Sequence, residues 1–145
     1  MKLSTRTRYG IRAAIEIAKH YGRGPVQIKV IGQRQAISVK YLEQLMAILK
    51  SGGFVHSVRG SRGGYVLARE PEQIRLDELV LALEGSITTA ECVDDNGYCA
   101  RAADCVAREL WTKVQHAVMD VLRSFTLKDL VERTKSQRET LSYQI

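Results

Sequence analysis

The chain has 145 residues, a length that suits one domain, with room for an appended arm. It is 45% hydrophobic and only 6% aromatic, a composition typical of a helical globular protein. No run approaches the roughly 20 apolar residues of a membrane span, and no apolar signal segment stands at the N-terminus. We therefore expect a cytoplasmic protein that makes no use of a membrane.

The net charge of +6 is divided unevenly along the chain. Residues 1–75 contain 14 Lys or Arg and 4 Asp or Glu, whereas residues 76–145 contain 8 and 12. Such a division suggests that the first half binds a polyanion, and nucleic acid is the obvious one. An ordinary solvated surface is the alternative that charge alone leaves open.

Helix-forming patterns fill the first 50 residues. A first helix is expected from about Ser4 to Tyr21 because apolar residues recur at helical spacing, and glycines 22 and 24 then stop it. A short helix is predicted over 28–34, and Ser38 is a good N-cap for a third helix over 39–50. Two helices joined by so tight a turn predict a helix-turn-helix at about 28–51.

A β-hairpin is predicted directly after this motif. Residues 54–58 and 65–67 are predicted to form short strands, and the turn between them contains three glycines and two arginines. A glycine-rich loop also suits phosphate binding, but this one joins two strands rather than opening a helix, so a nucleotide site is a poor interpretation. The hairpin over 54–67 is better interpreted as the wing of a winged helix.

The second half is predicted to hold a helix over 76–84, a loop over 85–104, a long helix from Cys105 to Ser124 and a short one from Leu127 to Arg133, with fraying over the last ten residues. The predicted fold class is therefore mainly α with a small β-hairpin wing: a winged helix-turn-helix plus a long C-terminal dimerisation helix. Three regions follow. They are a DNA-binding region (1–75), a connecting helix with a cysteine loop (76–106), and a dimerisation helix with a polar tail (105–145).

The second helix of such a motif enters the major groove of DNA and presents its N-terminal residues to base edges. Gln44 can make a paired contact to adenine, and Glu43 can accept a hydrogen bond from the amino group of cytosine. Arginine in a glycine-rich wing tip suits a narrow minor groove. The candidate DNA contacts are therefore Ser38, Lys40, Tyr41, Glu43 and Gln44 on the helix, and Arg59, Ser61 and Arg62 in the wing. A solvated helix face is the alternative for each polar residue taken singly.

Four segments together resemble the Rrf2 family of bacterial winged-helix regulators: MKLSTRTRYG (1–10), ISVKYLEQL (37–45), VRG (58–60) and GGY (63–65). The resemblance covers roughly residues 1–131, and within the family the chain most resembles the iron–sulfur cluster regulators. It implies base contacts from Ser38, Lys40, Glu43 and Gln44, and a minor-groove contact from Arg59.

Three cysteines, Cys92, Cys99 and Cys105, lie within 14 residues of one another. An odd, clustered set in a cytoplasmic chain argues for metal ligation or redox chemistry rather than a disulfide framework. The spacings fit neither a zinc finger nor a ferredoxin. The resemblance implies that the three cysteines hold an iron–sulfur cluster, with [2Fe–2S] favoured over [4Fe–4S]. Idle thiols and a redox thiol pair are the alternatives.

The fourth ligand of such a cluster departs from the family pattern. In the similar members it is a histidine three residues after the third cysteine, where this chain has Arg108, which stays protonated and cannot ligate iron. A branch that senses nitric oxide uses an aspartate where this chain has Arg8. The substitutes left open are another thiol, a group from a partner subunit, or one of Asp104, Glu109 and His116.

An apolar seam runs along the long helix and needs a partner to cover it. Its members are Val106, Leu110, Val114, Ala117 or Val118, Val121 and Phe125. We expect a homodimer, with an internal core helix as the alternative, and two-fold symmetry then predicts a pseudo-palindromic operator in double-stranded DNA.

The predicted function is a transcription regulator that senses iron–sulfur status and controls genes of cluster assembly. One alternative is a family regulator of cysteine metabolism or of a redox or nitric oxide response. Another is an iron–sulfur electron carrier without DNA binding. No catalytic constellation is recognisable, and the histidines at 20, 56 and 116 are scattered, so we expect no enzyme.

Overall fold

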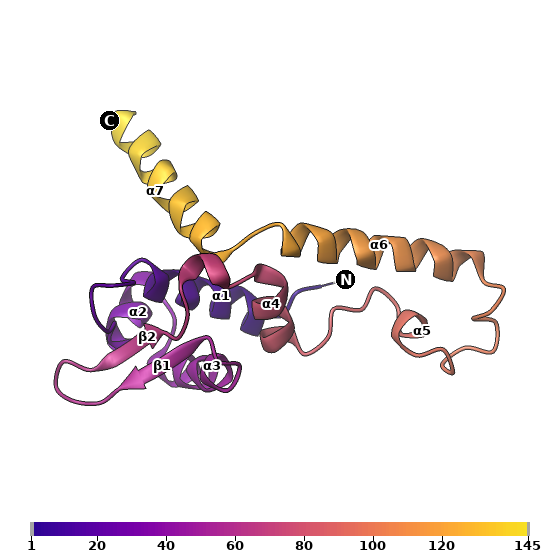
Figure 1. The fold of residues 1–145 in the computed structure, drawn as a ribbon, viewed down its shortest axis with the longest axis horizontal. Coiled ribbons are helices and arrows are strands. Elements are labelled where there is room, and N and C mark those ends of the chain that lie inside the picture. Colours follow the sequence, from indigo (N-terminus) through magenta and orange to yellow (C-terminus); the bar gives the residue numbers. More distant parts are fainter. Residues whose placement is uncertain (1, 145) are drawn as a thin grey trace.

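The structure is a computed structural model that describes residues 2–144. It is mostly helical and contains a two-stranded antiparallel sheet, as the sequence predicts (Figure 1). In chain order the elements are α1 (Thr5–Ala18), α2 (Ile28–Gln35), α3 (Val39–Ser51), β1 (Val55–Val58), β2 (Gly64–Leu67), the 3-10 helix η1 (Pro71–Gln73), α4 (Leu76–Glu84), α5 (Glu91–Asp94), α6 (Val106–Arg123) and α7 (Leu127–Tyr143).

The helix-turn-helix is formed by α2 and α3. The turn between them passes through Ala36, whose φ of 53° is left-handed and ends α2. Ser38 then caps α3, because its hydroxyl accepts a hydrogen bond of 3.2 Å from the Tyr41 amide. The apolar face of α3 is fully buried, at Leu42, Leu45, Met46 and Leu49. This burial fixes which side of the helix is left for solvent or a ligand.

The hairpin β1–β2 is anchored to the start of α2. Val55 pairs with Leu67 and Val58 with Gly64, and Val26 bridges Tyr65 through two backbone hydrogen bonds of 2.9 Å. The tip turns at Gly60, whose φ of 117° disfavours any residue with a side chain. The wing is therefore held at Tyr65, close to its turn, while residues 59–62 of the tip lie in solvent.

One core joins the first half of the chain to α4 and to the start of α7. Its buried side chains come from α1, α2, α3, the hairpin and α4, together with Leu127 and Val131 of α7. Two backbone hydrogen bonds, from Leu76 to Phe125 and from Leu127 to Ile74, close the chain on itself around this core.

The predicted helix boundaries are wrong at two places. α1 ends at Ala18 rather than Tyr21, because His20 and Tyr21 donate to carbonyls three residues back in a tight turn. α7 runs to Tyr143 rather than ending near Arg133. A capping box between Thr126 and Asp129 starts it, and the polar residues that follow are mostly good helix formers. The expected loop over 85–104 also contains the short helix α5.

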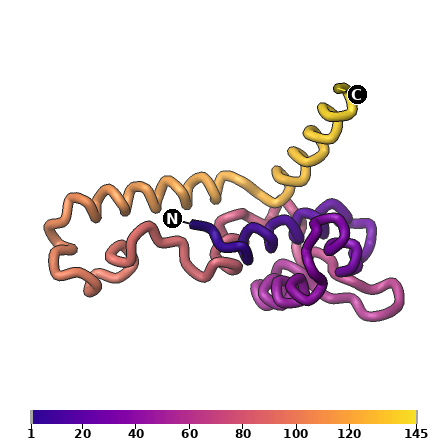
Figure 2. The backbone as a smooth tube through the Cα atoms, turned by 180° about the vertical axis from the view of Figure 1, so that it is seen from behind, coloured from indigo at the N-terminus to yellow at the C-terminus, as the bar shows by residue number. Residues whose placement is uncertain are grey.

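α6 leaves the core and projects from it beside the cysteine loop, defined here as residues 85–105 (Figures 1 and 2). None of its 18 residues is buried. Over the residues that the structure describes, no helix combines the length and apolar character that crossing a membrane requires.

Candidate nucleic-acid interface

The N-terminal part of α3 presents the polar residues that the sequence selects. Ser38, Lys40, Glu43 and Gln44 are exposed, and Tyr41 is half-buried. Leu42 and Leu45 between them are fully buried, so the helix cannot rotate without exposing its apolar face. The structure thus gathers all five predicted helix residues on or beside one solvent-facing surface.

Tyr41 is supported from behind by α1. Its ring meets the Tyr9 ring edge-on, with centroids 6.0 Å apart, and the Arg12 guanidinium lies 5.1 Å from the centroid of Tyr9. Such edge-to-face and cation–π contacts orient aromatic rings. Residues of α1 therefore position part of the α3 surface, through a contact that no local sequence pattern indicates.

The wing tip presents the other predicted contacts. Arg59, Ser61 and Arg62 are all exposed. The Gln27 side chain donates to the Ser61 carbonyl at 3.4 Å, and Lys50 donates to the Ser57 hydroxyl at 3.1 Å. These bonds tie the hairpin to the start of α2 and to the end of α3. The two predicted groups of DNA contacts are thus carried on elements that are bonded to each other.

The cysteine loop does not gather its thiols into a ligand set. Cys92 lies in α5 and is half-buried, Cys99 is exposed, and Cys105 is the N-cap residue of α6. Within residues 2–144, the structure forms no group of three or more His, Cys, Asp or Glu that could hold a metal ion. The residues as they lie here do not fit an iron–sulfur cluster.

Arg108 stands where the family pattern places a histidine ligand, and it has a different task here. Its guanidinium donates to the Cys92 carbonyl at 2.7 Å, to the Ala102 carbonyl at 3.5 Å, and to the side chain of Asn96. Hydrogen bonds from a charged donor are stronger than neutral ones. Arg108 therefore fastens three points of the cysteine loop to the first turn of α6.

The residues that the sequence leaves open as a fourth cluster ligand do not take part in the hydrogen bonds of the Arg108 side chain. Glu109 pairs with Lys113 at 2.9 Å, while Asp104 and His116 are exposed. Arg8, at the position of the aspartate in the nitric oxide branch, donates to the Thr5 hydroxyl at 3.3 Å. Asp104 and Glu109 line the same pocket as Cys105, but within the described part of the chain they do not join the thiols in a group of three or more possible metal ligands.

α6 carries an exposed apolar stripe made of Val106, Leu110, Val114 and Val121, with exposed fractions from 40% to 80%. Its members recur at helical spacing and share one face. The other side of α6 contacts the cysteine loop, where Gln115 accepts from the Thr89 amide at 3.1 Å and donates to Asp94 at 3.0 Å. The stripe corresponds to most of the seam that the sequence predicts.

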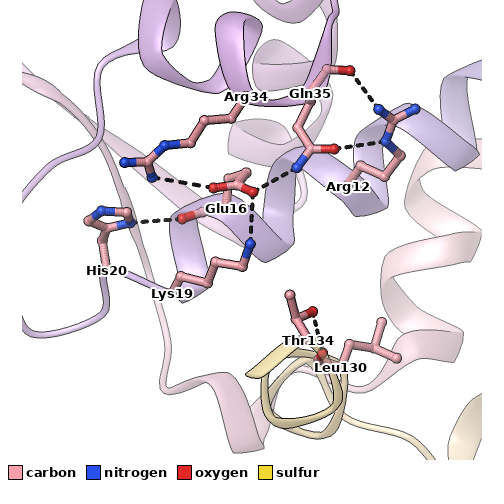
Figure 3. Close-up of polar contacts among 8 residues, drawn as sticks. All are labelled: Arg12, Glu16, Lys19, His20, Arg34, Gln35, Leu130 and Thr134. Carbon is pink, nitrogen blue, oxygen red and sulfur yellow. Dashed lines mark hydrogen bonds and ion pairs between the residues drawn. The ribbon is translucent and has the colours of Figure 1, made fainter. Parts of the chain in front are cut away.

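A buried carboxylate, Glu16, organises a polar network that the sequence did not reveal (Figure 3). It accepts from Gln35 at 2.6 Å, from Lys19 at 2.9 Å and from Arg34 at 3.4 Å. Burial alone would raise the pKa of Glu16, but these hydrogen bonds and the Lys19 charge outweigh it and hold the pKa below its usual 4.5. Gln35 is in turn held by Arg12, which donates to its side-chain and main-chain oxygens.

The chain is similar over most of its length to known transcription regulators. It is 45% identical over 131 residues to "Protein rrf2" of Nitratidesulfovibrio vulgaris, covering 90% of this chain and 87% of that one. It is 41% identical over 145 residues to the regulator CymR of Bacillus subtilis, with 100% of both chains covered. It is 36% identical over 131 residues to the regulator IscR of Sodalis glossinidius, covering 90% of this chain and 79% of that one.

Solved structures give the same result. The structure of B. subtilis CymR, titled the global cysteine regulator, superposes with a TM-score of 0.79 at 41% identity, covering 92% of this chain and 98% of that one. T. potens IscR superposes with a TM-score of 0.76 at 40% identity, covering 92% and 88%. An oxidised form of Staphylococcus aureus CymR gives 0.73 at 36% identity, covering 91% and 97%.

Residues 3–133 match the family described as "Rrf2: Iron-dependent Transcriptional regulator". The relatives are transcription regulators, not enzymes. The fold has the winged helix of these neighbours, and its exposed polar surface lies where a helix-turn-helix meets DNA. This chain therefore belongs to the Rrf2 family of DNA-binding transcription regulators.

Proposed function

We propose that the chain binds a pseudo-palindromic operator as a homodimer, with α3 in the major groove and the wing tip in the minor groove. The observation that carries the proposal is the polar N-terminal face of α3, which is held outward by fully buried leucines beside an exposed cationic hairpin tip. The basic first half of the chain supplies the attraction to phosphates that such binding needs.

The residue roles follow from donor and acceptor chemistry. Gln44 pairs with adenine, Glu43 accepts from cytosine, and Ser38, Lys40 and Tyr41 contact the DNA around them. Glu43 is repelled by phosphates unless it finds a donor, so it lowers affinity for sequences that lack one. In the wing, Arg59 enters the minor groove, while Ser61 and Arg62 contact the backbone.

The dimer is supported by the exposed stripe of α6. A helix of 18 residues with no buried side chain gains little stability from its own fold. A second copy of the same helix would cover Val106, Leu110, Val114 and Val121 and would place two α3 helices about a two-fold axis.

The cysteine loop is the element that we propose receives the signal, because it leads into α6 at Cys105 and is fastened to it by Arg108. The finer hypothesis is sensing through an iron–sulfur cluster on Cys92, Cys99 and Cys105, with two irons favoured. Similarity to the IscR relatives supports it. The separated thiols and the bonds of Arg108 weigh against it.

A second candidate is control of cysteine metabolism. It is supported by the separation of the three thiols and by the similarity, over the whole of both chains, to a regulator whose structure is titled the global cysteine regulator. In this version the cysteine loop responds without a metal.

Operator selection from random DNA, followed by affinity measurements at fixed salt, tests the DNA proposal. We expect a two-fold symmetric site, and Gln44→Ala should weaken binding by about 1–3 kcal/mol and relax one base position in each half-site. Arg59→Ala should weaken binding most where the minor groove is narrow. Lys113→Gln, far from α3 on α6, removes one charge and should leave the selected sequence unchanged. Equal affinity for all sequences would reject the proposal.

Anaerobic reconstitution with iron and sulfide separates the two signals. Visible absorption with about two irons per chain, lost in Cys92→Ser, Cys99→Ser and Cys105→Ser, supports the cluster. Arg108→His is the informative variant, because it restores the ligand type of the similar regulators. Colourless protein with unchanged operator binding, in both the wild type and this variant, would reject the cluster and leave the second candidate.

A further inference from the structure

A cationic pocket of about 610 Å³ lies between α7 and the paired helices α1 and α2. Its positive side chains come from three separate parts of the chain: the end of α1, the helix-turn-helix, and the second half of α7. They are Lys19, Arg23, Arg34, Lys135 and Arg138, and His20 lines the same wall. The close-up of the α1 side shows Lys19 and Arg34 converging on Glu16, with Thr134 of α7 across from them (Figure 3).

The charges of this pocket do not balance. Glu16 is the one carboxylate among the residues that line it, and it is only 2% exposed. Its oxygens already accept from Lys19, Arg34 and Gln35. Arg23, Lys135 and Arg138 form no ion pair within the described residues. Several positive charges held around one hollow attract an anion from solution.

We propose that this pocket binds a small multivalent anion that carries two or more phosphate or carboxylate groups. Arg34 and Arg138 approach from different elements, and each guanidinium offers a planar pair of donors that matches such groups. An anion with one charge would satisfy only one side of the pocket. The volume lies within the range of about 300–1,000 Å³ that is usual for small-molecule sites.

Duplex DNA is a less suitable occupant. Figures 1 and 2 show α3 and the hairpin on one side of the core and α7 on the opposite side. A duplex lying against α3 and the wing would therefore not reach the α7 wall of the pocket. A small anion needs no such extended surface.

The pocket is connected to the DNA-binding surface through a continuous set of contacts. Glu16 binds Gln35, which binds Arg12, which lies over the ring of Tyr9. Tyr9 in turn meets Tyr41 at the N-terminal end of α3. An anion that competes with Glu16 for Arg34 would disturb Glu16, the first residue in this series of contacts. That the anion alters operator affinity rests on the function proposed above.

Calorimetric titration of the full chain, without DNA and at constant ionic strength, tests the site directly. The probes are inorganic pyrophosphate and citrate, and we expect saturable binding of at least one of them. Binding of pyrophosphate alone assigns the site to phosphates, and binding of citrate alone assigns it to carboxylates. Arg138→Gln and Arg34→Gln should each weaken the affinity about tenfold. Arg101→Gln, an exposed position in the cysteine loop, removes the same charge elsewhere and should leave it unchanged.

Arg138 is exposed and outside the Glu16 network, so its variant stays informative even if Arg34→Gln fails to fold. The absence of saturable binding overturns the proposal, and so does an equal loss in Arg101→Gln. Binding of non-operator duplex that falls in both pocket variants, with no competition by either small anion, also overturns it. Operator titrations with the bound probe then test the coupling separately. Failure to bind any operator would reject the proposed function and leave the anion site standing.

Discussion

The apolar residues of the winged-helix half are buried, whereas those along one face of α6 are exposed. In the first, Ile17, Ile31, Leu45 and Leu79 from four different helices are at most 1% exposed and form one core. In α6, the stripe residues remain in solvent, with Val106 at 80% and Val121 at 58%. Within each of these helices, as within α6, the apolar residues recur at helical spacing, so the two regions differ in what covers their apolar faces.

This contrast separates the residues that stabilise the single chain from those that the proposed second chain would cover. The core gains its stability within the chain, at roughly 25 cal/mol for each Å² of apolar surface buried. The stripe, which is exposed in the single chain, would gain such stability only in the proposed dimer. α7 is a third case: Leu127 and Val131 are buried in the core, and the helix then continues into solvent with mostly polar residues.

The largest expected effect comes from charging the stripe. In the double variant Leu110→Asp, Val114→Asp, dimerisation should be lost because a dimer would bury two unpaired carboxylates in each α6. Operator affinity should fall on the order of 10²–10³-fold, because each chain then holds one half-site only. Sedimentation and operator titrations measure both effects. His116→Asp adds a charge outside the stripe and should remain dimeric. A dimer that persists in the double variant would mean that α6 is not the interface.

A core substitution should lower the stability of the single chain, whereas a substitution in the stripe should not. Leu45→Ala should lower the free energy of unfolding by about 3 kcal/mol, because it leaves a cavity under α3. Val121→Ala in α6 should change it by less than about 0.5 kcal/mol when both are measured in the monomeric double variant. Urea denaturation gives both values. Similar losses at the two positions would contradict the contrast between core and stripe.

Local patterns predicted the DNA-binding half well. Residue type alone predicts Ser38 as an N-cap, and the leucine spacing after it predicts the buried and exposed faces of α3. The glycines of the hairpin turn also identified the wing. These features depend on neighbours within a few residues, so the sequence carries them directly.

Contacts between distant residues could not be predicted in this way. Gln35 meets Glu16 across 19 positions of sequence, and nothing local to either residue indicates the other. Arg108 could be excluded as an iron ligand from its chemistry, but its bonds to the cysteine loop depend on the path of residues 92–102. The polar composition of the end of α7 predicts fraying, but most of its residues are good helix formers and the helix continues to Tyr143.

A substitution at Arg108 tests whether the cysteine loop can be loosened without affecting the winged-helix core. Arg108→Gln removes the charged donor that holds the Cys92 and Ala102 carbonyls, so amide hydrogen exchange in residues 91–104 should accelerate about tenfold. Exchange in α3 should not change, because no residue of 91–104 belongs to the core that packs against α3. Lys113→Gln, about one turn along α6, is the control. Unchanged exchange in the loop would show that Arg108 does not hold it.

The smallest expected effect is on the pH dependence of the free energy of unfolding, and it comes from Glu16 in the first half of the chain. Because the pKa of Glu16 is lower in the folded chain than its usual 4.5, the folded state holds this proton less tightly than the unfolded state. Its contribution to stability is therefore complete above the unfolded value and is lost as the pH falls through the folded value. Glu16→Gln cannot titrate, so its free energy of unfolding should fall by about 1 kcal/mol less than that of the wild type between about pH 7 and pH 3.

Urea denaturation at several pH values measures this difference. Glu139→Gln, an exposed change near the end of α7, should follow the wild-type profile. If Glu16→Gln also keeps the wild-type acid profile, then the cations around Glu16 do not stabilise its charge, and the network would be held by packing alone. A smaller acid loss confined to Glu16→Gln would instead show that the stability of the winged-helix half depends on a buried charged network.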